Sequence, residues 1–217
     1  LKRHDIRVGE IIECLKESGI YENTTLILLG DHSAIDTHKV IRLNSIFREE
    51  GLIELKDGKL KSFKAIAREC GGSCYIYLDN KNKKYENKCL EVLERLKEEG
   101  ALEYILNKEE AIKAGANDQC DFMVEATRGY YFSNEYEGKV IEETKEIKNK
   151  HTYKAVHGYS PRKKDYGTFF LAFGRGIKSG VVLEEGKLIN HGPTLGRILG
   201  FNFEKADGIV EERILNL

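Results

Sequence analysis

The chain has 217 residues, of which 41% are hydrophobic and 33% charged, and its formal net charge is −1. These proportions exclude a disordered chain and a membrane-embedded one. The balance of charges gives no reason to expect a nucleic-acid polymer as the main partner. The longest apolar runs, such as residues 26–29, are too short to span a bilayer, so no membrane segment is expected.

The first residue is Leu1 and the single methionine is Met123, so we expect a piece of a longer protein. No signal-peptide pattern follows Leu1. The five cysteines are an odd number scattered along the chain, which favours reduced thiols over a disulfide framework. We therefore expect a cytoplasmic location. Nothing in the sequence predicts the oligomeric state.

The N-terminal part alternates between helix and strand patterns. Apolar residues at helical spacing predict a helix over 5–18 that ends at Gly19, and an unbroken apolar run predicts a strand over 24–29. A run without alternation is typical of a strand buried on both faces of a parallel sheet. A second helix is predicted over 38–50, with Gly51 after its end. This order favours an α/β fold.

Residues 51–150 have a different pattern and predict an inserted α+β lobe. Asp57-Gly58 is a tight-turn pair between two strand-like runs and predicts a hairpin. A polar, lysine-rich segment at 142–150 closes the lobe. The predicted elements of the lobe are the hairpin at 53–60, strands at 74–78, 121–126 and 129–132, and helices at 84–99 and 108–114.

The α/β pattern returns in the last third of the chain. A second apolar run predicts a buried strand over 168–173, and Pro193 is placed in the first turn of a helix that ends at Gly200. We therefore assign residues 1–50 and 151–217 to one core and residues 51–150 to the inserted lobe.

Three residues are candidates for metal binding. Asp31 and His32 directly follow the predicted strand, at the end where open α/β sheets place their ligand sites. Both residue types bind zinc, although an Asp-His pair after a strand also serves as a turn or a helix cap. His157 precedes the second predicted strand, and Gly158 after it allows a close backbone approach to a ligand. Taken alone, His157 is also compatible with an ordinary loop histidine.

Together these segments resemble a known family. Gly30-Asp31-His32 after an apolar strand, then the lobe, then His157-Gly158-Tyr159 before another apolar strand, resemble the type I phosphodiesterase/nucleotide pyrophosphatase family of the alkaline phosphatase superfamily. The resemblance implies an α/β fold, with a partial alkaline-phosphatase-like sheet, helices on its faces and the inserted α+β lobe. Further similar segments are 19–24, 40–44, 71–78, 129–133, 174–180, 193–194 and 206–208.

The resemblance also implies a site for two divalent metal ions, usually zinc, that hydrolyses a phosphate ester or a nucleotide. Asp31 and His32 would hold one ion and His157 the other. The remaining ligands and a Thr or Ser nucleophile are expected upstream of Leu1. No catalytic nucleophile is therefore assigned in this sequence, and this piece alone is expected to be inactive.

Two positions depart from the family pattern. Ser33 stands where a glycine usually follows the Asp-His pair, and Asn190 stands where an aspartate is frequent. Two alternatives stay open. The chain could come from another phosphatase or phosphomutase of the same superfamily, or it could be a non-catalytic α/β binding module.

Overall fold

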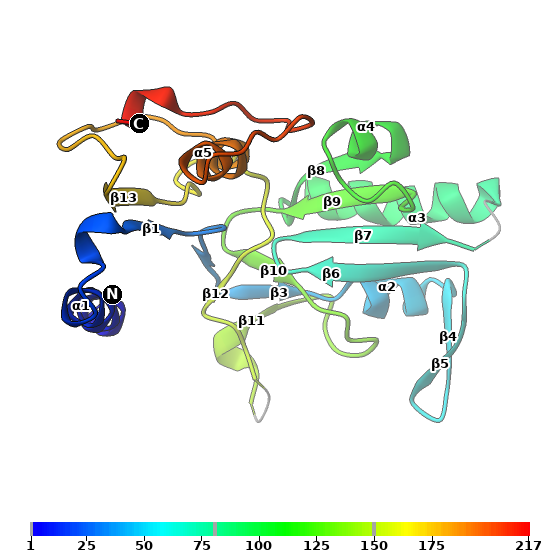
Figure 1. The fold of residues 1–217 in the computed structure, drawn as a ribbon. Helices are drawn as coiled ribbons and strands as arrows, with labels where there is room; N and C mark the ends of the chain where they lie inside the picture. The colour runs from blue at the N-terminus through cyan, green and yellow to red at the C-terminus, as the bar shows by residue number, and fades with distance from the viewer. Residues whose placement is uncertain (1, 80–81, 149–150) are drawn as a thin grey trace. The chain divides into compact units, whose positions relative to one another are not determined.

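A computed structural model describes residues 2–79, 82–148 and 151–217 (Figure 1). The chain divides into two compact units. Unit 1 consists of residues 1–31 and 168–217, and unit 2 of residues 32–167. Across the described ranges, no helix is both long and apolar enough to cross a membrane.

Unit 1 combines a two-stranded sheet with two helices. The first helix ends at Glu17, close to the predicted stop at Gly19, where a φ of 68° is incompatible with a continued helix. None of its residues is buried, and Ile6 and Ile11 are each 51% exposed. The elements of unit 1 are α1 (Lys2–Glu17), η1 (Tyr21–Asn23), β1 (Thr25–Leu29), β13 (Phe170–Gly174), η3 (Leu188–Asn190), α5 (His191–Ile198) and η4 (Glu212–Ile214).

The prediction of parallel strands buried on both faces is wrong for β1 and β13. The two strands pair antiparallel, with Ile27 opposite Ala172. Leu29 is 42% exposed and Leu171 is 53% exposed. An apolar run indicates burial but not strand direction. Among the described residues each of these strands has the other as its only partner in the sheet, and neither strand has a buried residue.

The centre of unit 2 is a four-stranded antiparallel sheet in the order β6-β7-β9-β8, with α2 and α3 packed against it (Figure 1). Asn82 caps α3 by accepting a hydrogen bond of 3.0 Å from the backbone N–H of Lys84. The central elements are α2 (Leu43–Glu49), β6 (Ala65–Cys70), β7 (Ser73–Leu78), α3 (Lys83–Glu98), β8 (Leu102–Asn107), α4 (Lys108–Lys113) and β9 (Phe122–Ala126).

Smaller sheets surround this centre. A three-stranded sheet has the order β10-β3-β11, and two further pairs are β4-β5 and β2-β12. Phe47 of α2, Ile76 of β7 and Leu93 of α3 have no exposed surface and belong to one continuous core. The surrounding elements are β2 (Ile35–Asp36), β3 (Lys39–Ile41), β4 (Ile53–Lys56), β5 (Lys59–Phe63), β10 (Tyr130–Phe132), β11 (Ile141–Glu143), η2 (Thr144–Glu146) and β12 (Ala155–Val156).

The predicted helix over 38–50 is wrong in its first third. Val40 and Ile41 lie in β3, which pairs with β10 on one side and β11 on the other, and α2 begins only at Leu43. Both residues are β-branched and are 2% and 0% exposed, so strand pairing on both sides overrides the helical spacing.

The two compact units are divided at different residues from the predicted core and lobe. The units meet at 31/32 and 167/168, whereas the predicted boundaries are 50/51 and 150/151. Residues 32–50 and 151–167 contribute β2, β3, α2 and β12, which pair or pack within unit 2. The predicted end of the lobe at residues 149–150 lies outside the described residues.

Candidate functional site

A pair of two-residue strands holds the candidate histidines of unit 2. Val156 of β12 lies opposite Ile35 of β2 in an antiparallel register. The pairing extends to Thr37, whose N–H donates to the carbonyl of Lys154 and whose hydroxyl donates to the carbonyl of Tyr153, each at 2.8 Å. Because an antiparallel register places the start of one strand beside the end of the other, the short segment before β2, which carries His32, runs close to His157, the residue after β12.

The imidazole rings of His32 and His157 stack within unit 2. Their centroids are 4.3 Å apart and their planes differ by 20°. Both side chains are exposed, while Val156, the residue before His157, is only 9% exposed. The strand pair is thus anchored in the core and presents two imidazoles at the surface of the unit.

The hydrogen bond of His32 defines its tautomer. Its Nδ1 lies 3.0 Å from the carbonyl oxygen of Ser33. A carbonyl oxygen only accepts, so Nδ1 carries the proton in the neutral ring and Nε2 carries the lone pair. A backbone carbonyl at the second ring nitrogen is the usual arrangement for a metal-binding histidine.

The backbone around His157 is packed against the turn between β6 and β7. The N–H of Gly72 donates to the carbonyl oxygen of His157 at 2.8 Å. A Cβ atom on Gly71 would overlap that same oxygen, and a Cβ on Gly158 would overlap the carbonyl oxygen of Cys70. Gly71 and Gly158 also have positive φ values, 71° and 83°. Glycine is therefore required on both sides of this contact.

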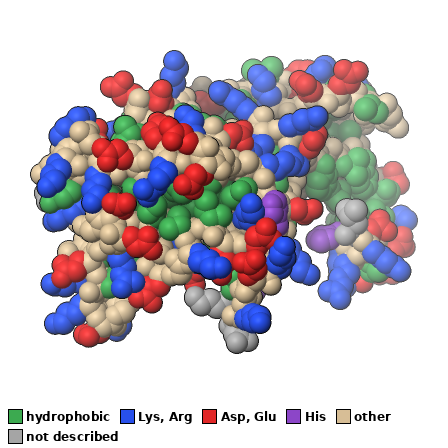
Figure 2. Space-filling model, turned by 180° about the vertical axis from the view of Figure 1, so that it is seen from behind, with side chains coloured by type: hydrophobic (Ala, Val, Ile, Leu, Met, Phe, Trp, Pro, Cys, Tyr) green, Lys and Arg blue, Asp and Glu red, His purple; other side chains and the backbone are tan. Residues whose placement is uncertain are grey.

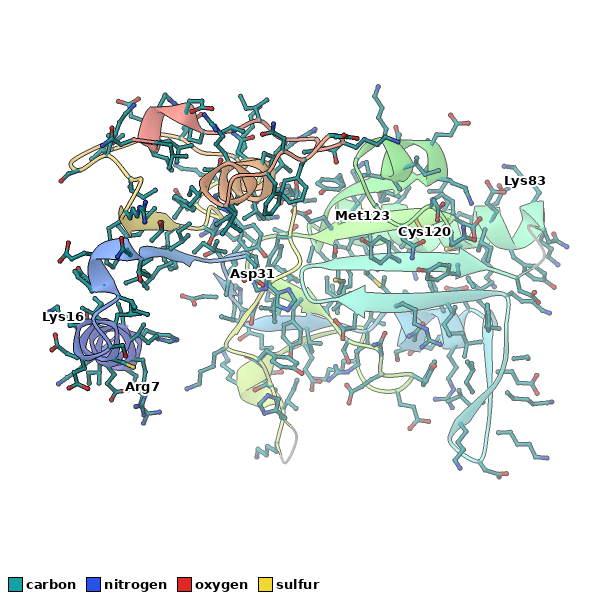
Figure 3. The ribbon with its side chains drawn as sticks, viewed as in Figure 1. Arg7, Lys16, Asp31, Lys83, Cys120 and Met123 are labelled. Carbon is teal, nitrogen blue, oxygen red and sulfur yellow. The ribbon has the colours of Figure 1, made fainter. Side chains whose placement is uncertain are left out.

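Asp31 is the last residue of unit 1 and directly precedes His32. It follows the end of β1 (Figure 3). The N–H of Gly30, the residue between β1 and Asp31, donates to the carbonyl of Phe169 at 3.1 Å. The Asp31 side chain is exposed. Asp31 and His32 thus remain a pair of sequence neighbours at the exit of β1, as the sequence predicts.

The donor set fits a zinc-type ion better than a hard cation, because imidazole nitrogen is a ligand that zinc prefers. Over residues 2–79, 82–148 and 151–217, no group of three or more His, Cys, Asp or Glu side chains forms a ready metal cage. The described residues thus provide a stacked pair of imidazoles, with the carboxylate of Asp31 next to His32 in the chain, and no complete set of metal ligands.

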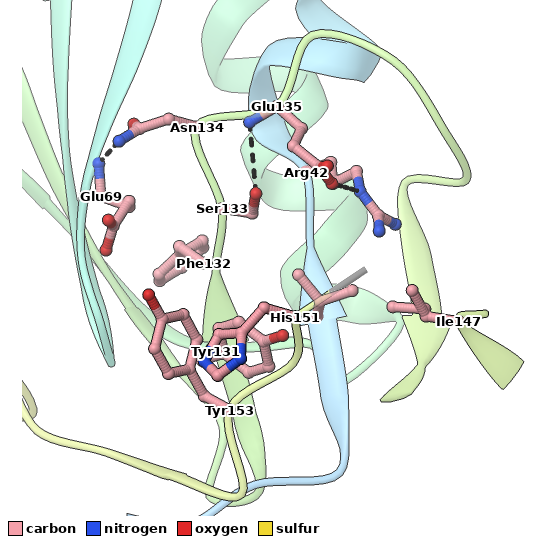
Figure 4. Close-up of a pocket in the computed structure, with 11 residues that line it drawn as sticks. Arg42, Glu69, Tyr131, Phe132, Ser133, Asn134, Glu135, Ile147, His151 and Tyr153 are labelled. Atoms are coloured by element: carbon pink, nitrogen blue, oxygen red, sulfur yellow. Dashed lines mark hydrogen bonds and ion pairs between the residues drawn. The ribbon is translucent and has the colours of Figure 1, made fainter. Parts of the chain in front are cut away.

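A separate hollow of about 360 Å³ lies in unit 2 beside β3 and β10 (Figure 4). Its cation, Arg42, is 3% exposed and is already bound to carboxylates of Glu135 at 2.5 Å and Glu142 at 2.9 Å. Tyr131 and Tyr153 meet edge to face on its wall, with ring centroids 5.7 Å apart. Because the charge of Arg42 is balanced, this hollow is a poor site for a phosphate group.

The surface charges are mixed. Over the face drawn in Figure 2, Lys and Arg side chains lie among Asp and Glu side chains of the described residues. Arg162, Lys163 and Lys164 form a basic run in the loop after His157. Lys163 is only 5% exposed at its side chain and pairs with Glu103 and Glu125. The basic run is therefore partly neutralised within the fold.

Sheets and helices together give the chain a mixed α/β fold. Residues 1–160 match the family model described as type I phosphodiesterase / nucleotide pyrophosphatase. The match covers most of the chain and includes Asp31, His32 and His157. The chain belongs to this family, which confirms the resemblance found in the sequence. Comparison with curated proteins gives no match.

Solved structures of two relatives have the same fold. Human ectonucleotide pyrophosphatase / phosphodiesterase 5 matches with a TM-score of 0.71 and 16% identity over 99% of this chain and 51% of that chain. The murine protein matches with a TM-score of 0.72 and 18% identity over the same shares, and one murine structure is an inactive variant in complex with AMP. At this identity the likeness shows the fold alone, and it confirms the predicted alkaline-phosphatase-like α/β class. The chain spans about half the length of these relatives.

The sequence did not predict the elements that bring the histidines together. β2 and β12 have two residues each, too few for a periodicity signal. Glu125 was also missed as a residue of interest, although it is a single charged residue between Val124 and Ala126 in a buried strand. A charge at a core position of a strand is the signal that could have found it.

Proposed function

We propose that this chain contributes metal ligands to a phosphodiesterase or nucleotide pyrophosphatase site that uses two divalent ions. Asp31 and His32 would hold one ion and His157 the other, with zinc as the expected metal. The observation that carries the proposal is the stacking of His32 on His157, at a centroid distance of 4.3 Å, inside the segment that matches the family model.

Hydrogen bonds hold the two histidines in place. His32 is oriented by its own hydrogen bond to Ser33, which leaves the lone pair on Nε2. His157 follows β12 and its carbonyl is held by Gly72. The two histidines flank the β2–β12 pair, so their backbone is already held near the pair before an ion binds, and less binding free energy is spent on ordering it.

Bound ions would supply positive charge and Lewis-acid polarisation for the oxygens of a phosphoryl group. The carboxylate of Asp31 would offset part of that positive charge. A nucleotide-type substrate is consistent with the AMP complex of the murine relative, and the substrate of this chain is part of the proposal. We assign no nucleophile among residues 1–217, expect it from an upstream segment, and expect no turnover by this chain alone.

Metal titration tests the ligand assignment. Cobalt(II), whose visible absorption reports nitrogen coordination, and zinc are titrated into the wild-type chain and into His32→Gln, His157→Gln and Asp31→Asn. Each variant should weaken binding by about tenfold or more, which is about 1.4 kcal/mol. His38→Gln is the matched control, since His38 is an exposed histidine of unit 2 that contacts Tyr130 instead. Equal affinity in all five proteins would contradict the assignment.

Turnover tests the reaction class. The protein extended upstream of Leu1 should hydrolyse a chromogenic phosphodiester with zinc, and His157→Gln should remove most of that activity. A preference for a phosphomonoester would instead favour a phosphatase of the same superfamily. Undiminished turnover in His157→Gln would rule out its role as a ligand.

A further inference from the structure

A buried ion pair lies directly beneath the loop that carries His157. Glu125 in β9 is 0% exposed. Its carboxylate forms an ion pair of 2.8 Å with the ammonium of Lys163, whose side chain is 5% exposed. A charged pair this deeply buried costs several kcal/mol of desolvation per ion, so it needs an identifiable reason to be there.

The Glu125 carboxylate also binds the loop backbone. Its Oε2 accepts from the N–H of Ser160 at 2.7 Å and from the hydroxyl of Tyr104 at 2.5 Å. Burial and this hydrogen bond raise the pKa of Tyr104, so the phenol keeps the proton that it donates. The loop is therefore tied to a strand that lies inside the four-stranded sheet, between β7 and β8.

Lys163 connects the same loop to the sheet at a second point. Its ammonium also contacts the carboxylate of Glu103 at 2.5 Å and the carbonyl of Ala126 at 3.2 Å. It lies 5.0 Å from the centre of the Tyr159 ring. All these partners belong to β8, β9 or the loop itself, so Lys163 joins the sheet to the loop on both sides of Ser160.

Two tyrosines of the loop, Tyr159 and Tyr166, meet edge to face with ring centroids 5.8 Å apart. The Tyr159 hydroxyl donates to the carbonyl of Tyr130 at 2.5 Å, and its ring lies where a Cβ on Gly72 would be. The N–H of Gly158 donates to the hydroxyl of Tyr166 at 2.9 Å. The residue after His157 is thus bonded within the loop, and the loop is bonded to β9.

We propose that Glu125 and Lys163 are positioning residues that hold the His157 imidazole against His32. Buried ion pairs add little net stability compared with apolar residues of the same size, but they fix one geometry because each charge demands its partner. Here that geometry sets the direction in which the chain leaves β12 at His157. That the placement of His157 matters for metal binding rests on the proposed function. That Glu125 and Lys163 determine this placement does not rest on it.

The stacked rings provide a direct measurement of position. The chain has six histidines, so their imidazole signals can be resolved by proton–carbon NMR and assigned by single substitution. In the wild type, His32 and His157 should show ring-current shifts and a cross-peak between the two rings. In Glu125→Gln, which keeps the shape but removes the charge, both shifts should move and the cross-peak should weaken at least about threefold, because the nuclear Overhauser effect falls steeply with distance.

The charge-neutral double variant keeps the test decisive if a single variant unfolds. Lys163→Met leaves a buried carboxylate without its cation, and adding Glu125→Gln should restore thermal stability while the displaced His157 signals remain. Leu93→Ala is the control for general destabilisation, since Leu93 is a fully buried residue of α3 that has no part in the network. It should lower the melting temperature without moving the His157 signals.

Two outcomes separate this proposal from the proposed function. Unchanged His32 and His157 signals in both the single Glu125→Gln and the double variant would overturn the positioning role. Zinc titration of the same proteins then gives an independent reading. If the wild type binds zinc, Glu125→Gln should weaken that binding, because the loop that carries His157 would be held less firmly. If the wild-type protein extended upstream of Leu1 also binds no zinc, the proposed function fails, and the NMR result still decides the positioning.

Discussion

The contact between Gly158 and the β6–β7 turn gives a sharp test of the packing around the candidate site. Gly158 has a φ of 83°, and a Cβ there would overlap the carbonyl oxygen of Cys70. Gly158→Ala should therefore carry two costs. A left-handed conformation costs a non-glycine residue about 1–2 kcal/mol, and moving the backbone to relieve the overlap adds about 1–3 kcal/mol.

A second glycine of unit 2 separates the two costs. Gly51 has a φ of 72°, and a Cβ there would meet no atom within 4 Å. Gly51→Ala should cost only about 1–2 kcal/mol, the conformational part. Both variants are compared by urea unfolding followed by circular dichroism, with the difference in midpoint converted by a common slope.

The difference in the free energy of unfolding between the two alanine variants isolates the cost of the overlap with Cys70. Gly158→Ala should be less stable than Gly51→Ala by about 1–3 kcal/mol, or about 2–12 °C in melting temperature. Equal stabilities would refute the reasoning, because they would mean that the β6–β7 turn gives way without cost and does not hold the backbone at His157.

Two further predictions concern titratable groups. Hydrogen bonds and ion pairing with Arg213 lower the pKa of Glu211 below its ordinary 4.5, so the stabilisation is present above pH 4.5 and is lost as the pH falls through the lower folded-state pKa. Arg213→Ala should raise the Glu211 midpoint in a carbon NMR titration, and an unchanged midpoint would contradict the pairing. Iodoacetamide followed by mass spectrometry should label Cys14 and Cys70, which are exposed, and spare the three buried thiols. Rapid labelling of a buried thiol would show that the core opens readily.

Much of the secondary structure could be predicted from local chemistry. The Asp57-Gly58 hairpin forms as the turn pair predicts, with φ values of 53° and 71° at the two residues. The amphipathic helix over 84–99 matches α3 to within one residue at each end. These elements need only neighbouring residues to specify them.

Elements whose identity depends on distant partners could not be predicted in the same way. Val40 and Ile41 fit a helical stripe, and only β10 and β11 on either side make them a strand. Whether β1 and β13 pair parallel or antiparallel likewise depends on the route of the chain between the two strands. Apolar spacing carries no information about either.

The residues of the candidate site could be selected from the sequence, but their arrangement in space could not. Asp31, His32 and His157 could be selected because they follow or precede apolar runs in the family pattern. The closeness of the two histidines depends on β2 and β12, which are too short to be recognised. The role of Glu125 depends on Lys163, far along the chain, and a single charge in a strand does not name its partner.

The short pair of β2 and β12 has a consequence for how this lobe can vary. Thr37 and Tyr153, which are bonded across the pair, are 116 positions apart in the sequence. Most of unit 2 is thus one long excursion whose two ends are tied together beside the histidines. The entropy of closing a loop rises only with the logarithm of its length, so even doubling the excursion would cost about 0.6 kcal/mol. Insertions at an outlying turn such as Asp57-Gly58 should therefore leave the histidines in place, whereas a single inserted residue in β2 or β12 would shift their register.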